Sequence, residues 1–263
     1  MRLLSKDEFQ KFSTYVLNNG KPATRSLMKV IIPHFPAFEN AALKKKKAFK
    51  KVFPKEPYRD GKMRETMFLL FGHLKDFLVQ VEVNLSTLQR TLFLLRQLRK
   101  KGDDRILGMH LKVAEGEVEK DTSGDENFYF NSFQIITESD AFFGKQQQRA
   151  TDSTLQQKVD YLDIFYLIQK LKDTCEMLNR QNIVQTQFKL HLVPEIKSFL
   201  QAKDNPYTDV PMLNIYYLVF LTLTENKKEE HYKKLVVLLE KHAPGFLGEE
   251  SRAMYRYAQN YCI

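Results

Sequence analysis

Apolar residues recur every three or four positions along most of the chain, which is the spacing of helices with one buried face. Ser5 and Glu8 form a capping-box pattern, in which each side chain can accept a hydrogen bond from the other residue's backbone N–H. The first helix is therefore expected to start there and to end at 18–20, where two asparagines and a glycine follow one another. Two more helices are expected at 23–32 and at about 41–53, because a proline follows each of them.

The longest regular pattern alternates by three and four residues over a stretch rich in leucine. It comprises Met67, Phe71, Leu74, Leu78, Val81, Leu85, Leu88, Leu92 and Leu95. Taken alone, this pattern is typical of a coiled-coil seam of four heptads. The alternative is two antiparallel helices that keep the same phase, because 86–89 repeats the capping-box pattern where a second helix would start. The residues beside the seam are also apolar, so we favour helices packed on two sides, and whether 62–101 is one helix or two stays open.

The rest of the chain continues as helices joined by short links. Gly102 is expected as the C′ residue of one helix, with aspartates at 103–104 starting the next. Residues 144–153 are predicted to form a loop or a solvated helix end. Helices are expected at 105–120, 128–143, 154–178, 182–201, 208–224, 227–242 and 249–263. Short links between helices indicate antiparallel neighbours.

The C-terminal third is weakly repetitive. Pro206 and Pro244 lie 38 residues apart, and the same offset relates two tyrosines. Two helices in each repeat of about 34–40 residues are typical of tetratricopeptide-type solenoids, although no segment carries the full consensus. The predicted fold class is therefore all-α, with stacked antiparallel helical hairpins forming an α-solenoid behind a small helical module. We expect a basic N-terminal module at 1–60 and a helical-hairpin array at 61–263, with one continuous domain as the alternative.

Composition narrows the class of protein. Hydrophobic residues make up 43% of the chain, which excludes a disordered protein. The two cysteines, Cys175 and Cys262, are far apart and lack CxxC spacing, which excludes a disulfide-stapled secreted scaffold and a zinc ribbon. The first residues lack the apolar core of a signal peptide, and the apolar runs are well short of the roughly 20 residues that span a bilayer. We expect a cytoplasmic protein with no membrane partner.

Charge is concentrated in the first part of the chain. Residues 1–120 hold 25 Lys/Arg and 13 Asp/Glu, a net charge of +12, and the remaining residues hold 16 and 19, a net charge of −3. The densest basic stretch lies at 44–55 and contains Lys44, Lys45, Lys46, Lys47, Lys50, Lys51 and Lys55. An acidic partner is therefore expected, and nucleic acid is included in that class.

Two interpretations of the basic stretch stay open. Its apolar positions, which include Phe49 and Phe53, place the lysines on the solvent face of a helix, where they could follow a phosphate backbone as the third helix of a winged-helix module does. However, the stretch contains no arginine to read guanine, and both phenylalanines are needed for the core instead of for stacking on bases. A solvated lysine face is the commoner explanation of such a charge run.

Local motifs give no catalytic or metal site. The six histidines include no HExxH and no pair four residues apart, and no glycine-rich phosphate loop or nucleophile elbow is present. The paired carboxylates, Asp160 with Asp163 and the group at 115–119, are expected to be solvated or ion-paired. Cys175 lies between acidic residues, which would raise the pKa of its thiol, so it is a poor nucleophile. We expect no enzyme activity, no metal and no cofactor.

Four tyrosines are candidates for a peptide-binding groove: Tyr161, Tyr166, Tyr217 and Tyr255. Tyrosines on helices are first of all packing residues, but in a solenoid part of such a stripe can line the concave face. The leading hypothesis is a non-enzymatic scaffold that binds another protein. The alternative is a nucleic-acid-binding protein that uses the basic helix at 44–55.

The segments 4–12, 47–64 and 92–96, together with the ending Tyr-Cys-Ile, resemble a family of all-helical proteins common in Bacteroidetes. The resemblance covers most of the chain and implies a bacterial, all-helical protein, but it carries no known activity. Members of that family are longer, and the ending at 258–263 is apolar and has no helix stop signal. We therefore expect the chain to be a fragment or a truncated product, which the intact mass of native material tests.

Overall fold

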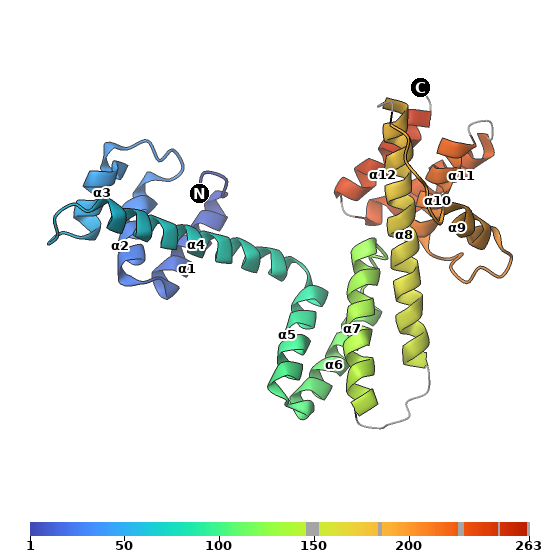
Figure 1. Ribbon diagram of the computed structural model, residues 1–263, viewed down its shortest axis with the longest axis horizontal. Helices are drawn as coiled ribbons and strands as arrows, with labels where there is room; N and C mark the ends of the chain where they lie inside the picture. The colour runs from blue at the N-terminus through green and yellow to red at the C-terminus, as the bar shows by residue number, and fades with distance from the viewer. Residues whose placement is uncertain (146–152, 184–185, 226–228, 247, 262–263) are drawn as a thin grey trace. The chain divides into compact units, whose positions relative to one another are not determined.

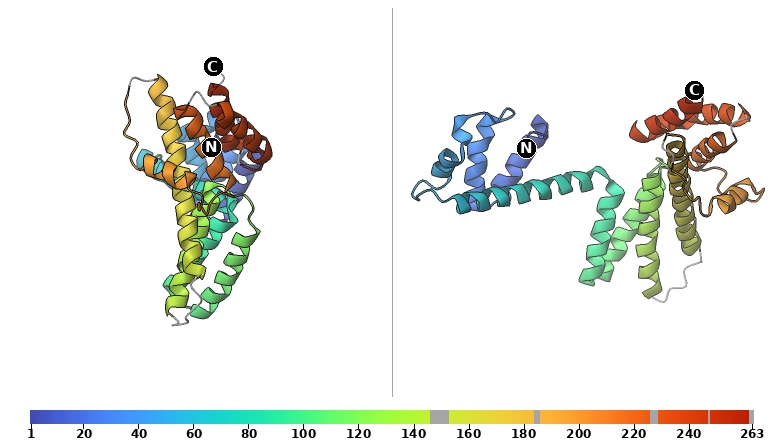
Figure 2. Two further views of the ribbon diagram at one scale, coloured as in Figure 1. Left: turned by 90° about the vertical axis from the view of Figure 1, so that its right-hand side faces the viewer. Right: turned by 45° about the horizontal axis from the view of Figure 1, so that its top comes forward.

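The computed structural model describes residues 1–145, 153–183, 186–225, 229–246 and 248–261 (Figures 1 and 2). Every regular element in these ranges is a helix, which confirms the all-α prediction, and none of these helices is long and apolar enough to cross a bilayer. The α-helices are α1 (Lys6–Asn19), α2 (Pro22–Ile31), α3 (Lys45–Val52), α4 (Asp60–Leu85), α5 (Thr87–Lys101), α6 (Asp104–Lys120), α7 (Glu126–Lys145), α8 (Ser153–Ile183), α9 (Val193–Gln201), α10 (Pro211–Thr224), α11 (Glu229–His242) and α12 (Gly248–Tyr261). Three short 3₁₀ helices are η1 (Ile32–His34), η2 (Ala41–Leu43) and η3 (Ala243–Gly245).

The helices form two compact units, an N-terminal unit (Met1–Ser86) and a C-terminal unit (Thr87–Ile263). The sequence suggested a boundary at residue 60 instead. In the structure α4 starts at that residue but packs against α1 and α2, and its buried side chains complete the core that those helices share. The physical reason is that α1, α2 and α3 are too short to bury their apolar faces against one another alone.

The core of the N-terminal unit is aromatic. The ring of Phe9 stacks on Phe35 with centroids 4.3 Å apart, and the centroids of Phe12 and Phe77 are 5.5 Å apart. The predicted capping box at the start of α1 is confirmed, because the Ser5 N–H donates to Glu8 Oε2 and the Glu8 N–H donates to Ser5 Oγ. Figure 1 shows α1, α2 and α3 along α4, whose last turns continue past them.

The long apolar run at 67–95 is divided between two helices, since α4 ends at Leu85 and α5 begins at Thr87. Two helices in place of one continuous helix are therefore confirmed, but their antiparallel pairing is not, because α4 and α5 belong to different units. Packing on two sides, however, is wrong for α4. One face is buried through residues such as Leu70 and Leu74, whereas Met67 and Phe71 in the neighbouring stripe are exposed.

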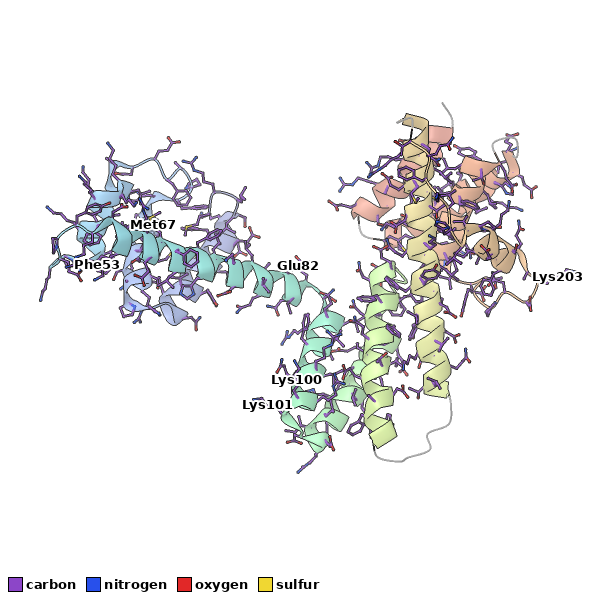
Figure 3. All side chains as sticks on the ribbon, in the orientation of Figure 1. Phe53, Met67, Glu82, Lys100, Lys101 and Lys203 are labelled. Carbon is purple, nitrogen blue, oxygen red and sulfur yellow. The ribbon has the colours of Figure 1, made fainter. Side chains whose placement is uncertain are left out.

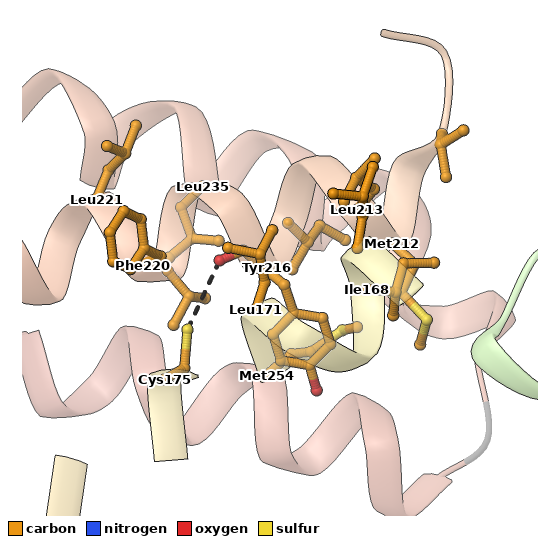
Figure 4. Packing of buried hydrophobic residues seen from close by; sticks show 14 of the residues in the cluster. Ile168, Leu171, Cys175, Met212, Leu213, Tyr216, Phe220, Leu221, Leu235 and Met254 are labelled. Carbon is orange, nitrogen blue, oxygen red and sulfur yellow. Dashed lines mark hydrogen bonds between the residues drawn. The ribbon is translucent and has the colours of Figure 1, made fainter. Parts of the chain in front are cut away.

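In the C-terminal unit several helices pack on their neighbours in sequence, but α8 packs on α7 and α10 far more than on α9. Helices α5, α6 and α7 pack against one another, α7 packs along α8, and α8 packs against α10. Helices α11 and α12 then pack against α10 and against each other. Figure 4 shows the centre of this core, where Leu171, Leu213, Tyr216 and Met254 lie together.

One stretch of the C-terminal unit differs from the sequence prediction. A helix was expected at 182–201 after a link at 179–181, but α8 continues to Ile183 and α9 starts only at Val193. Pro194 occupies the first turn of α9, where its missing N–H leaves no hydrogen bond unmade, and Leu192 before it has a left-handed φ of 66°. A helix running through Pro194 would lose a hydrogen bond and clash with the preceding turn.

Several sequence predictions fall on residues outside the described ranges. The expected loop at 144–153 falls mostly on 146–152, and α7 extends to Lys145 before it. The expected link after Glu225 and the last two residues of the chain also lie outside the described ranges.

Candidate functional site

Helix α3 carries the lysine-rich stretch and is held by one buried face. Ala48, Phe49 and Val52 lie in the core of the N-terminal unit, as the apolar stripe predicted for the latter two. Lys45 Nζ lies 2.5 Å from Asp60 Oδ1, so Lys45 links α3 to α4. The other lysines of the stretch are exposed to solvent: Lys44, Lys46, Lys47, Lys50, Lys51 and Lys55.

These exposed lysines lie on both edges of the buried face. Lys44 and Lys51 are four residues before and three residues after Ala48, so they share its edge of the helix. Lys46 lies toward the opposite edge, with Nζ 5.8 Å from the centroid of the Tyr58 ring, and Lys50 follows it at i+4. Lys47, which is also exposed, lies between the two edges, so the cations continue around the solvent side of α3.

A hollow of about 380 Å³ opens in the N-terminal unit beside the Ala48 edge of α3. Buried core side chains, including Leu27 and Met63, contribute to its lining, while Met67 and Phe71 of α4 are 47% and 54% exposed. Figure 3 labels Met67 on α4. The full lining consists of Met1, Arg2, Leu27, Ile31, Phe38, Leu43, Ala48, Met63, Met67, Leu70, Phe71 and Leu74. Arg2 is the only charged residue among them, so the lining is almost entirely apolar.

The exposed apolar surface continues along α4 beyond the hollow. Met67, Phe71, Leu78 and Leu85 are all exposed and follow one another at spacings of four and seven residues. We call these four residues the α4 stripe. They belong to the heptad pattern seen in the sequence, whose other α4 members, Leu74 and Val81, pack in the core, so the pattern includes both exposed and buried positions.

Cations border the hollow and the α4 stripe. Lys75 Nζ lies 5.5 Å from the centroid of the Phe71 ring, on the side of the stripe away from the core. Arg2 lines the hollow and donates a hydrogen bond to the Ala37 carbonyl at 3.3 Å. With Lys44 and Lys51 on the α3 side, positive charge lies on both sides of an apolar surface.

The wall of the hollow includes a residue in an uncommon backbone conformation. Phe38 has a φ of 53°, in the left-handed region that large side chains seldom adopt. Its ring is packed edge-on against Phe9 and Phe35, with centroids 5.9 and 5.8 Å away, and its N–H donates to the His34 carbonyl at 2.8 Å. Packing of this kind can hold a strained residue in place, so the wall is preformed.

The whole net charge of the chain resides in the N-terminal unit. Met1–Ser86 contains 17 Lys/Arg and 8 Asp/Glu, a net charge of +9, and Thr87–Ile263 contains 24 of each and is neutral. The basic character that the sequence placed in residues 1–120 is thus a property of the unit that contains the hollow. A field of this sign attracts acidic partners to that unit.

The four candidate tyrosines all lie in the C-terminal unit but do not line a common hollow. Tyr217 lines a hollow of about 580 Å³ between α9, α10 and α11, whereas Tyr255 borders a polar hollow of about 680 Å³ along α12. Tyr161 packs on Phe128 with ring centroids 6.0 Å apart, and Tyr166 is exposed on α8. The lining of the Tyr217 hollow is mostly apolar, with Lys233 and Lys234 at its edge.

The paired carboxylates contact hydroxyl groups from other parts of the chain. The Tyr207 hydroxyl lies 3.3 Å from Asp160 Oδ1 and 3.2 Å from Asp163 Oδ2. The Ser139 hydroxyl donates to Glu115 Oε1 at 2.5 Å, and the Thr91 hydroxyl donates to Glu117 Oε2 at 2.8 Å. Within the described ranges, no group of three or more His, Cys, Asp and Glu side chains is placed to hold a metal ion.

Cys175 is fully buried between α8 and α10, and its Sγ donates to the Tyr216 carbonyl at 3.7 Å (Figure 4). Burial raises the pKa of its thiol far above the ordinary value, so a thiolate is not accessible near neutral pH. The sequence predicted a raised pKa for a different reason, the acidic neighbours. The structure identifies burial as the cause.

The hollow itself was not predicted from the sequence. Its signal is the α4 stripe, whose spacing marks an apolar face but does not tell whether that face meets a core or solvent. The two methionines of α4 in the lining, Met63 and Met67, carry no motif. The hollow forms where α2, η2 and α3 meet α4, so its position depends on tertiary contacts that the sequence pattern does not record.

Comparison of the chain with models of known protein families, with curated proteins and with solved structures finds no match. The function is therefore argued from the residues of the molecule itself.

Proposed function

We propose that this chain is a non-enzymatic protein-interaction scaffold whose N-terminal unit binds a helical segment of another protein. The observation that carries the proposal is the apolar hollow of about 380 Å³ that opens onto the exposed α4 stripe. Contiguous exposed apolar surface marks interaction sites, and grooves lined by adaptable methionines receive amphipathic helices of partner proteins.

A nucleic-acid-binding protein is the second candidate, favoured by the six exposed lysines at 44–55. In that case the phosphates would contact lysines on both edges of α3, and affinity would fall steeply with salt. Phosphates gain nothing from an apolar lining, however. The stretch also lacks arginine, Phe49 is buried, and the centroid of the half-buried Phe53 ring lies 4.3 Å from Lys62 Nζ. We therefore rank protein binding first.

The C-terminal unit would extend the scaffold. We propose that α5 to α12 form a solenoid-type array of hairpins, which the packing of α5 on α6, of α7 on α8 and of α10 on α11 supports. Its hollow at Tyr217 would give a second surface for a partner. A cytoplasmic location is part of the proposal, and the free thiol of Cys175 is consistent with a reducing compartment.

Site-specific photo-crosslinking in the cells that make the protein tests this function. The photoreactive amino acid p-benzoylphenylalanine replaces Phe71 in the α4 stripe, or Gln10, an exposed residue of α1 that does not line the hollow. We expect protein adducts at position 71 and few at position 10. Adducts that nuclease removes, or equal protein adducts at both positions, would contradict the proposal.

A further inference from the structure

We infer that the segment bound in the hollow is an amphipathic α-helix with aspartates and glutamates on both sides of its apolar face. This rests on the proposed function and names the chemistry of the partner.

The dimensions of the site set the length of that helix. The α4 residues that line the hollow run from Met63 to Leu74, a rise of about 17 Å at 1.5 Å per residue. About three turns of a bound helix cover this length, and Leu78 and Leu85 continue the apolar surface by about three more turns of α4. A partner helix with apolar residues at i, i+3, i+4 and i+7 would therefore match both the hollow and the α4 stripe.

The charges that border the site select acidic flanks. Lys44 and Lys51 lie on the α3 side, and Lys75 lies on the opposite side of the α4 stripe. No ion pair is found for these three lysines among the described residues, so they are available to a partner's carboxylates. The net charge of +9 on the N-terminal unit adds long-range attraction for an acidic helix.

The same charges argue against other occupants. A second copy of the chain would bring two units of charge +9 together at this surface, and repulsion disfavours that contact. A small apolar ligand could fill the hollow but would leave Leu78 and Leu85 exposed. A nucleic acid would use the lysines and leave the hollow empty. An acidic amphipathic helix satisfies both the apolar and the basic part of the site.

Binding of three labelled peptides to the full chain, measured by fluorescence anisotropy, tests the inference. The first is an acidic amphipathic peptide of about six turns, with Leu and Phe repeating at i, i+3, i+4 and i+7 and Glu on both flanks. The second replaces every Glu by Lys, and the third has the composition of the first in an order without an apolar face. We expect saturable binding of the first peptide only, weakening as salt is added.

Two matched pairs of charge reversals locate the bound flanks. Lys44→Glu with Lys51→Glu changes the edge beside the hollow and should weaken the acidic peptide by about tenfold or more. Lys46→Glu with Lys50→Glu makes the same change of charge on the opposite edge and should weaken it by less than about threefold. All four side chains are exposed, so both variants should fold, which circular dichroism checks.

A third variant tests the apolar part of the site. Phe71→Ala removes a side chain that is 54% exposed, so it should leave stability nearly unchanged while weakening the acidic peptide by about tenfold. A single-stranded oligonucleotide serves as a competitor without apolar residues. If it binds more tightly than the acidic peptide and is insensitive to Phe71→Ala, the inference is overturned in favour of nucleic acid.

Two further outcomes would overturn the inference. One is binding of the basic peptide as tightly as the acidic one. The other is equal weakening by the two lysine pairs. Protein adducts at position 71 together with no binding of the acidic peptide would leave the protein-binding function standing and remove only the acidic helix as its partner.

Discussion

Lys45 Nζ lies 2.5 Å from Asp60 Oδ1, so the first residue of α3 is paired with the first residue of α4. Arg64 of α4 also contacts Asp60, with Nε 2.7 Å from Oδ2. The pairs fix the start of α3 against α4, and they remove Lys45 from the lysines available to a partner. They thereby help to hold Ala48, which lines the hollow, against α4.

Asp60→Asn should make the stability of the protein depend less on pH in the acidic range. The hydrogen bond from Lys45, with further contributions from Tyr58 and Arg64, lowers the pKa of Asp60 from 3.8 to about 2. Because the pKa of Asp60 is lower in the folded protein, its carboxylate stabilises the fold at pH values above the pKa of the unfolded state. This contribution is lost as the pH falls through about 2. The melting temperature of the wild type should exceed that of Asp60→Asn at about pH 5, and the difference should shrink toward pH 2. A difference that grows on acidification would contradict this role.

Replacement of leucine by alanine should lower the free energy of unfolding substantially only where the side chain is buried. Leu213 of α10 is 0% exposed and Leu155 of α8 is 49% exposed. Leu213→Ala should lower the free energy of unfolding by about 2–5 kcal/mol, because it removes buried methyl groups and leaves a cavity. Leu155→Ala should change it by less than about 0.5 kcal/mol. Urea denaturation gives both values, and equal losses would mean that α10 is not the centre of this core.

Lys172 is expected to stabilise the C-terminal unit by joining three helices. Its Nζ donates to Glu126 Oε2 at 2.9 Å and to Glu250 Oε2 at 2.7 Å, and the hydroxyl of Tyr216 donates to the other oxygen of Glu250. Lys172→Met would leave two half-buried carboxylates without a cation, so the free energy of unfolding should fall by about 2–3 kcal/mol at pH 7.

The pH dependence of this contribution follows from the pKa of Lys172. Burial lowers that pKa, but the hydrogen bonds with Glu250 and Glu126 outweigh burial and the net change is a rise above 10.5. A lysine with a raised pKa contributes its full stabilisation at pH values below 10.5 and loses it only at higher pH. Lys172→Met should therefore remove the whole contribution at neutral pH. Lys170→Met, two residues away on α8, is the control, and a comparable loss there would contradict a specific role for Lys172.

Cys175 should resist thiol reagents in the folded protein. It is fully buried and the pKa of its thiol is raised by burial, so both access and thiolate formation are suppressed. N-ethylmaleimide followed by peptide mass spectrometry should show modification at Cys175 in denaturant and little in buffer. Rapid modification without denaturant would mean that α8 and α10 separate readily.

The sequence by itself determined the helices and many of their ends, because those depend on neighbouring residues. The capping box at Ser5 and Glu8 starts α1, and Gly102 ends α5 with a left-handed φ of 75°. Asp103 then caps α6 by accepting from the Ile106 N–H at 3.0 Å. The α8–α9 stretch was predicted wrongly at two points: the expected link at 179–181 lies inside α8, and α9 starts at Val193 instead of residue 182.

Only the tertiary structure decided which apolar faces are buried. The heptad pattern runs through Met67, Phe71 and Leu74 without distinction, yet Leu74 meets α1 and α2 while the other two face solvent. The lysines at 44–55 likewise differ through their surroundings, since Lys45 is paired with Asp60 while Lys44 is exposed next to Leu43, which lines the hollow. Periodicity records that a side chain is apolar or charged, whereas its exposure depends on helices distant in sequence. The hollow and its basic border therefore depend on the tertiary structure.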